Sequence, residues 1–352
     1  RHIDKNLSHK FWLIVFTSIS SLGAALFWFA YPGPESIIFV CGLVIISNIT
    51  FELGGVVYNS LLPVFSSKRK IGSLSGKAWA AGYAGGILCL LIILFGFVQN
   101  ENPLFGIEKD QAANIRIAGP IVAIWFIIFS IPLLLKIKKN KKIAFYKEVS
   151  LFKEVISNVK ALFRKSNQGR FLLSRMIYTD GLNTLFAFGG LYAAGTFNMS
   201  FSEIIIFGIL INITAGIGAL FFSYLDDRIG PKFIIKISLI SLIIFGSTTL
   251  IIEDKELFIL FGSILGFFIG SVQSSSRSLM SRYISNGNNT ETFGLYAISG
   301  KFTAFIGPAV LAITISIFDS QRAGMGSIII FLLIGLILLQ RVIEPKSDFF
   351  VI

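Results

Sequence analysis

Continuous apolar runs of about 20 residues recur along the whole chain, and short polar or basic stretches separate them. A helix of that length rises 1.5 Å per residue and crosses the roughly 30 Å hydrocarbon core of a bilayer. The runs do not alternate at period two, so helices are expected and a transmembrane barrel is not. Ten spans are predicted: residues 11–30, 37–61, 75–98, 117–135, 171–197, 204–224, 233–252, 257–280, 293–318 and 323–340.

Composition supports an all-α polytopic membrane protein. Hydrophobic residues make up 54% of the chain and charged residues only 14%, against roughly 25% charged in soluble domains. The mean hydropathy is +0.77. These values exclude a water-soluble globule.

Neither a metal, a cofactor nor catalytic chemistry is expected. The two cysteines, Cys41 and Cys89, each lie within an apolar run, and both histidines, His2 and His9, lie near the start of the chain. This distribution indicates neither a disulfide framework nor a thiolate or imidazole metal site. A nucleophile, a base and an orienting group do not occur at recognisable spacing, so an enzyme is not expected.

Charge is distributed by loop. A net charge of +12 would suit nucleic-acid binding if the cations formed one patch. They lie instead in alternate loops, and loops rich in Lys and Arg stay on the cytoplasmic side of a membrane. We therefore expect no nucleic-acid partner and both termini in the cytoplasm. The opposite loops contain only a few cations: Lys109, Arg116, Lys255 and Arg322.

One long basic loop, residues 136–170, divides the chain into a half with four spans (1–135) and a half with six (171–352). The loop also carries apolar residues such as Phe145 and Leu162, which indicates an amphipathic, interfacial segment. Two roles stay open. The loop is either a solvated linker held on anionic lipid headgroups or a brace between the two halves.

A short repeat relates the two halves. The sequence Ser-Gly-Lys occurs at 75–77 and again at 299–301, near the start of the second-last span of each half, and Gly82 or Gly307 follows. Repeated halves are common in membrane carriers. We therefore expect two pseudo-symmetric halves in which two further spans precede Arg1, so that the chain holds ten of twelve helices. A ten-helix protein is the alternative.

A charged motif follows the sixth span. The segment 226–232 contains Asp227, Arg228 and Gly230, followed by Lys232. This pattern resembles the signature loop of the major facilitator superfamily, except that Ser223 replaces the glycine expected four residues before the aspartate. The resemblance implies that Asp227, Arg228 and Gly230 form a charge relay to helix ends that holds one gate closed. An ordinary charged turn is the alternative.

Further motifs resemble one branch of that superfamily, the autophagy-related vacuolar amino-acid effluxers and their bacterial relatives. The resemblance implies a facilitator fold and carriage of small solutes, which in the vacuolar members are neutral amino acids leaving a degradative compartment. It covers nearly the whole chain from Phe11 onward. The residues that carry it are Phe51-Glu52, Tyr58 to Pro63, Gly82 to Gly86, Arg175, Tyr178, Asp180-Gly181, Asn183-Thr184, Gln273, Ser276-Arg277, Phe293 to Tyr296 and Gly307-Pro308.

Ionisable groups within the spans are candidate site residues, because each costs about 2.5–3.5 kcal/mol there and normally faces water or a partner. Glu52 and Asn59 share a stripe of the second span, and Arg175, Asp180 and Asn183 give the fifth span a wide polar face. Glu52 and Asp180 are the only acids in the expected spans, so proton coupling would require one of them to titrate. Packing alone is the alternative for Glu52. A pair between Arg175 and Asp180 is less favoured, since five residues place them about 140° apart on one helix.

Later spans add three more candidates. Gln273 and Arg277 lie one helical turn apart and are expected to face a solute or a gate, whereas Gly266 and Gly270 are expected to allow close helix packing. Lys301 lies roughly 12 Å along its span, from eight residues at 1.5 Å each. Its side chain either contributes to the site or extends to the cytoplasmic surface.

These observations predict a secondary transporter that moves a small polar solute, with neutral amino acids as the best fit and a proton as the candidate coupling ion. A facilitator of sugars, nucleosides or drugs and a non-transporting membrane scaffold are the alternatives. The expected partners are the solute and, at the basic loop, anionic lipid headgroups. Short loops favour the plasma membrane of a bacterium over a vacuolar membrane.

Overall fold

The computed structural model describes residues 3–4, 8–107, 109–137, 166–284 and 289–345. Helices and turns account for these residues, and no strand occurs among them. Nine helices in this part of the chain are long and apolar enough to cross a membrane. The prediction of an all-α polytopic membrane protein is therefore confirmed. Most of the expected basic loop, residues 138–165, lies outside the described residues.

The chain divides into two compact units. Unit 1 comprises Arg1–Leu61 and Gly85–Tyr146, and unit 2 comprises Leu62–Ala84 and Lys147–Ile352. Helix α5 (Ile71–Ile93) belongs to both, because its first part packs within unit 2 and its second part within unit 1. One boundary between the units therefore falls inside a helix.

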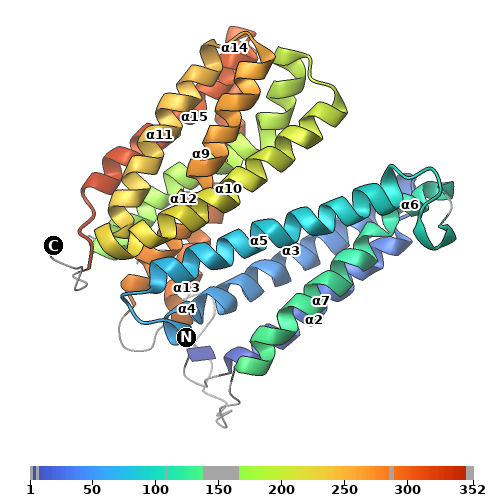
Figure 1. Ribbon diagram of the computed structural model, residues 1–352, viewed down its shortest axis with the longest axis horizontal. Helices are drawn as coiled ribbons and strands as arrows, with labels where there is room; N and C mark the ends of the chain where they lie inside the picture. Colours follow the sequence, from blue (N-terminus) through green and yellow to red (C-terminus); the bar gives the residue numbers. More distant parts are fainter. Residues whose placement is uncertain (1–2, 5–7, 108, 138–165, 285–288, 346–352) are drawn as a thin grey trace. The chain divides into compact units, whose positions relative to one another are not determined.

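Unit 1 is built around α2 (His9–Leu26), which packs against α3 (Ile37–Ser60) and α7 (Ala118–Lys136) (Figure 1). The approach of α7 is close, since a Cβ on Gly119 would lie 2.9 Å from the Cβ of Phe27. Small residues allow such approach between membrane helices. Short helical segments complete the unit: η1 (Phe27–Phe29), η2 (Pro34–Ser36), η3 (Leu94–Val98), η4 (Leu104–Gly106), η5 (Asp110–Ala112) and α6 (Ala113–Arg116).

Unit 2 holds the remaining helices: α4 (Leu62–Phe65), α9 (Asn167–Phe197), α10 (Phe201–Ile229), α11 (Pro231–Ile251), α12 (Lys255–Arg282), α13 (Asn289–Lys301), α14 (Ile306–Phe318) and α15 (Gln321–Gln340). Helix α12 packs against α10 and α11, and α15 packs against α9 and α11 (Figure 1). Glycines bring α12 close to α10. A Cβ on Gly266 would lie 2.6 Å from the carbonyl oxygen of Ile211, and one on Gly270 would lie 2.6 Å from the carbonyl carbon of Ala215.

Helix α9 corresponds to the fifth expected span, 171–197, although it is not among the nine helices that are apolar enough to be counted above. Its 31 residues exceed the about 20 needed to cross a bilayer. Polar side chains within it, including Arg175, Asp180 and Asn183, lower its hydropathy. Such side chains need partners inside the protein.

The charged segment 226–232 is not the loop that the sequence predicts. Helix α10 continues through Asp226 and Asp227 to Ile229, and α11 begins at Pro231. Only Gly230 lies between the helices, with a φ of 94°. Glycine adopts positive φ without steric cost, and proline suits the first position of a helix, where its missing N–H would have no partner.

The predicted span 293–318 is also different, because it consists of two helices. Helix α13 ends at Lys301, residues 302–305 form turns, and α14 begins at Ile306. Pro308 contributes to the break, since it has no N–H to donate to the carbonyl of Ala304 and its ring crowds that carbonyl. The break falls inside the 30-residue segment that is apolar enough to cross a membrane.

Candidate functional site

A carboxylate of α10 caps the start of α5 within unit 2. The backbone N–H of Gly72 donates to Oδ1 of Asp227 over 2.8 Å, and the N–H of Ser73 donates to Oδ2 over 2.8 Å. The first N–H groups of a helix have no partner within the helix, and its dipole favours a negative charge there. Asp227 therefore holds the start of α5 by geometry and by charge.

A buried arginine of α12 joins the two aspartates of α10. Nη2 of Arg282 lies 2.9 Å from Oδ1 of Asp226 and 3.2 Å from Oδ1 of Asp227. The hydroxyl of Ser278 also donates to Oδ1 of Asp226, over 2.8 Å. The side chains of Arg282 and Asp226 are each only 1% exposed, so neither charge has water as an alternative partner.

A second arginine of α12 binds the first turns of α5. Nε of Arg277 donates to Oγ of Ser75 over 2.9 Å, and its Nη2 donates to the carbonyl oxygen of Ser75 over 2.6 Å. Its guanidinium also lies 5.6 Å from the centre of the Trp79 ring. One turn earlier on α12, Oε1 of Gln273 accepts from the hydroxyl of Tyr83 over 2.6 Å.

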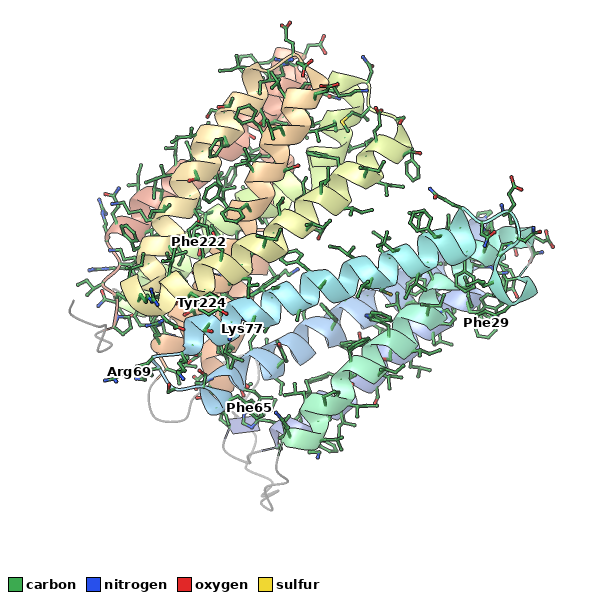
Figure 2. All side chains as sticks on the ribbon, in the orientation of Figure 1. Phe29, Phe65, Arg69, Lys77, Phe222 and Tyr224 are labelled. Atoms are coloured by element: carbon green, nitrogen blue, oxygen red, sulfur yellow. The ribbon has the colours of Figure 1, made fainter. Side chains whose placement is uncertain are left out.

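The contacts of Asp227 and Arg277 with the start of α5, together with the ion pair between Arg282 and Asp227, are called the α5 lock. Farther along α5, Nζ of Lys77 lies 5.4 Å from the centre of the Tyr224 ring on α10 (Figure 2). Gln273 and Arg277, expected to face a solute or a gate, both bind α5. In this state they therefore belong to the contact between α5 and α12.

The structure assigns the motif residues differently from the resemblance. Asp227 caps α5 as a relay residue would, but its cation partner is Arg282 rather than Arg228, whose side chain is exposed. The motif did not indicate Arg282 or Asp226. The available signal was an arginine five residues after Arg277, at the end of an otherwise apolar and small-residue helix.

The segment after α15 packs over the same end of unit 2. Nζ of Lys232 donates to the carbonyl oxygens of Gln340 and Val342, over 3.1 and 2.6 Å. The hydroxyl of Tyr283 donates to the carbonyl oxygen of Ile343 over 2.7 Å. Glu344 then lies against Gly230, where a Cβ would be 2.8 Å from both carboxylate oxygens. The positive φ of Gly230 favours glycine there, and the Glu344 carboxylate packs against it.

Burial raises the pKa of Glu344 to about 7, although the positive charge of Arg282 acts in the opposite direction. Between the ordinary value of 4.5 and this raised value, the folded protein holds a proton that the unfolded chain has lost. The free energy of unfolding therefore falls as pH rises through this window. We expect Glu344→Gln to remove this part of the pH dependence, measured as the midpoint of thermal unfolding from about pH 5 to about pH 8.

The exposed Glu101 provides the matched control for that measurement. Glu101→Gln removes a carboxyl of the same type outside unit 2, and we expect its unfolding midpoints to follow the wild-type pH profile. Equal pH profiles for Glu344→Gln and the wild-type protein would contradict the role given to Glu344.

A second polar cluster, the α9 cluster, consists of Arg175, Asp180 and Asn183 at the break between α13 and α14. Nη1 of Arg175 donates to the carbonyl oxygen of Tyr296 over 2.5 Å, and the guanidinium carbon lies 3.5 Å from the centre of that tyrosine ring. The Asn183 amide donates to the carbonyl oxygen of Gly300 over 3.3 Å. Arg175 and Asp180 thus take partners from other segments, as their angular separation predicts.

The remaining candidates lie elsewhere. Glu52 and Asn59 lie in α3 of unit 1, and both are partly buried. Lys301 forms the C-terminal residue of α13, where its side chain is exposed. The described residues contain no group of three or more His, Cys, Asp or Glu that could hold a metal ion.

Sequence comparison gives one family and several relatives. The family described as "vacuole effluxer Atg22 like" matches residues 4–348. A Bacillus subtilis protein named as the MFS-type transporter YxiO is 23% identical over 308 residues, which are 86% of this chain and 70% of that protein. Autophagy-related protein 22 of Kluyveromyces lactis is 23% identical over 370 residues, covering 95% of this chain and 73% of the relative.

Solved structures of major facilitator transporters share the fold. The fucose:proton symporter FucP of E. coli has a TM-score of 0.70 at 14% sequence identity, and the alignment covers 96% of this chain and 84% of FucP. The human organic anion transporter MFSD10 has a TM-score of 0.71 at 15% identity, covering 96% of this chain and 80% of that one. At these identities the likeness concerns the fold alone.

Proposed function

We propose a solute and a mechanism for this chain, which belongs to the Atg22-like vacuole effluxer family and is a membrane transporter of the major facilitator type. The proposed solutes are neutral amino acids, and the proposed mechanism is alternating access with a proton as coupling ion. Two supports are independent of the family. The intramembrane polar groups are few and of both signs, which suits a small zwitterion, and α5 is bound at its start by contacts that side chains can release.

The α5 lock carries the mechanistic part of this proposal. Helix α5 begins in unit 2, where Asp227 and Arg277 bind it, and continues into unit 1. Asp227 binds the start of α5 by two hydrogen bonds. A displacement of α5 by a few ångströms would therefore break both of them. We infer that the lock closes the pathway on one side, and that opening this side releases α5 from α10 and α12. Positively charged loops favour the cytoplasm for this side.

Two sets of polar side chains are each proposed to bind the solute: Glu52 and Asn59 in unit 1, and the α9 cluster in unit 2. The membrane is proposed to be the plasma membrane of a bacterium, with both termini in the cytoplasm. We also retain the proposal that residues 136–170 bind anionic lipid headgroups, since Lys and Arg close to a membrane surface each contribute about 1 kcal/mol to such binding.

Uptake of labelled leucine tests the solute and the residues together. We expect proteoliposomes that contain the wild-type protein to take up leucine, and Glu52→Gln with Asp180→Asn to lower the rate at least about tenfold, which corresponds to about 1.4 kcal/mol. The double substitution removes the two carboxylates but retains the shape of both side chains. Glu101→Gln, outside the spans, serves as the control and is expected to leave the rate unchanged.

A panel of competing solutes separates the alternatives in the same vesicles. An excess of unlabelled neutral amino acids is expected to suppress leucine uptake, whereas sugars and nucleosides are not. Suppression by a sugar or a nucleoside alone would assign the other type of facilitator. Absence of flux for every solute tested would support a scaffold and overturn the transport proposal.

A further inference from the structure

The break between α13 and α14 interrupts the backbone hydrogen bonds of the helix. The end of α13 leaves carbonyl groups without helical partners, and the start of α14 leaves N–H groups without them. At membrane depth such groups need partners within the protein or a water-filled cavity. The break lies inside a segment long and apolar enough to cross the membrane, so side chains from a neighbouring helix are the expected partners.

The α9 cluster supplies these partners: a cation lies at the carbonyl groups of α13 and an anion lies at an N–H group of α14. Arg175 and Asn183 donate to carbonyl groups near the end of α13, those of Tyr296 and Gly300. Asp180 lies at the other side of the break, where its Oδ2 accepts from the N–H of Gly307 over 3.2 Å. A cation near a helix C-terminus and an anion near an N-terminus are both favourable arrangements.

Asp180 is only partly satisfied by this contact. The residue is 2% exposed, and its Oδ1 has no hydrogen-bond partner among the residues that the structure describes. The single bond from Gly307 is long for an N–H to a carboxylate, for which about 2.7–2.9 Å is usual. An ionised carboxylate with one weak hydrogen bond is costly to bury.

Close packing at this point suits a proton better than a metal ion. A Cβ placed on Gly307 would touch Thr184 Oγ1 and would lie 3.2 Å from Oδ1 of Asp180. The start of α14 therefore packs closely against both side chains. A sodium or larger cation needs several oxygens at more than about 2 Å around an open centre.

Among the residues that the structure describes, no cation forms an ion pair with Asp180. Helix α14 has no ionisable residue between Ile306 and Phe318, and α15 contributes Ile328 and Phe331 beside Gly181. The cations on the helices that contact α9 have other partners or are exposed. Arg277 binds Ser75, Arg282 binds Asp226 and Asp227, Lys255 binds Glu203, and Arg322 donates to Leu250. The side chains of Arg228 and Lys301 are exposed.

We propose that Asp180 is a proton-binding site and that its occupancy sets the contact between α9 and the start of α14. When the carboxylate is ionised, it attracts the N–H of Gly307 and the positive end of the α14 dipole. When one proton binds, the charge is lost, the bond from Gly307 weakens, and the start of α14 is free to move. The break is therefore a hinge whose position depends on one proton.

The inference deepens the proposed function, because it names the residue that carries the coupling ion. Movement of α14 away from α9 would change the polar surface that α9 presents to a solute. The proton site itself does not depend on the identity of the solute. Its test is therefore chosen to succeed or fail without any measurement of flux.

Infrared difference spectroscopy of the reconstituted protein detects the proton directly. On lowering the pH from about 8 to about 4, which brackets the ordinary range of carboxyl groups, we expect a C=O stretching band of a buried carboxylic acid to appear. One component of this band should be absent in Asp180→Asn and retained in Glu52→Gln, whereas the component of the partly buried Glu344 is identified by its loss in Glu344→Gln. The proposal would be overturned if Asp180→Asn removed no titrating component from the wild-type spectrum.

Amide hydrogen exchange then tests the hinge. The quantity compared is the ratio of the exchange rate of peptides covering residues 302–310 in the wild-type protein to that in Asp180→Asn at the same pH. This ratio cancels the intrinsic pH dependence of exchange. We expect the ratio to rise as the pH is lowered. Equal ratios at all pH values would show that Asp180 does not control α14. If the band titrates but no leucine is carried, the proposed solute fails and the proton site stands; if leucine is carried without a titrating band, the proton site fails alone.

Discussion

Replacing Arg282 with Met is expected to cost about 3–5 kcal/mol of unfolding free energy, because removal of one partner leaves a buried charge without compensation. The side chains of Arg282 and Asp226 are each 1% exposed, and Nη2 of Arg282 also lies 3.2 Å from Asp227. A loss of this size is a large fraction of the 5–15 kcal/mol that typically separates folded from unfolded protein. Thermal unfolding of the detergent-purified protein, followed by tryptophan fluorescence, provides the measurement.

A second substitution separates the buried charge from the loss of packing. Arg282→Met combined with Asp226→Asn removes both charges of the pair, and we expect it to recover much of the stability lost in the single variant. Arg228→Met is the matched control, since Arg228 occupies the adjacent α10 end with its side chain exposed, and a change within about 0.5 kcal/mol is expected there. A single variant as stable as this control would contradict the structural role of Arg282.

The lengths of the apolar runs were sufficient to predict most of the helical spans, because the bilayer sets a minimum length for each of them. The predicted span 37–61 corresponds to α3 (Ile37–Ser60), and 323–340 corresponds to α15 (Gln321–Gln340). The same pattern could not show the break after Lys301, since both sides of the break are apolar. A break of this kind depends on partners from another helix, which hydropathy does not encode.

Candidate site residues were found in the sequence by their cost in a membrane, but their partners were not. Arg175, Asp180 and Asn183 stand out as polar groups of one span, yet nothing in the sequence links them to Tyr296, Gly300 or Gly307. The motif likewise indicated Asp227 without indicating Arg282. Such pairs are separated by many residues along the chain, so only the packing of helices brings them together.

The two polar clusters of unit 2 share one physical device, a side chain that satisfies the end of another helix. Asp227 accepts from the first N–H groups of α5, and Asp180 accepts from one near the start of α14. Each contact combines a hydrogen bond with the charge of a carboxylate at the positive end of a helix dipole. Contacts of this type are strong in one geometry and are lost after a small displacement, which suits elements that must alternate between two positions.

Release of α5 is the expected result of replacing Asp227 with Ala. Loss of an N-terminal cap typically costs 0.5–2 kcal/mol, which lowers the ratio of bound to released α5 by about 2- to 30-fold. Ile71, at the start of α5, is fully buried in the bound state. A cysteine introduced there by Ile71→Cys, in a background where Cys41 and Cys89 are Ala, should therefore react with a water-soluble thiol reagent faster by the same factor.

Asp254 offers the matched control for this experiment, because it caps a different helix of the same unit. Its Oδ1 accepts from the N–H of Leu257 over 2.8 Å at the start of α12, so Asp254→Ala removes an equivalent cap without touching α5. We expect the labelling rate of the introduced cysteine to stay at its parent value in this variant. Equal acceleration by both substitutions would indicate general loosening of unit 2, and no acceleration by Asp227→Ala would show that the cap does not hold α5 in place.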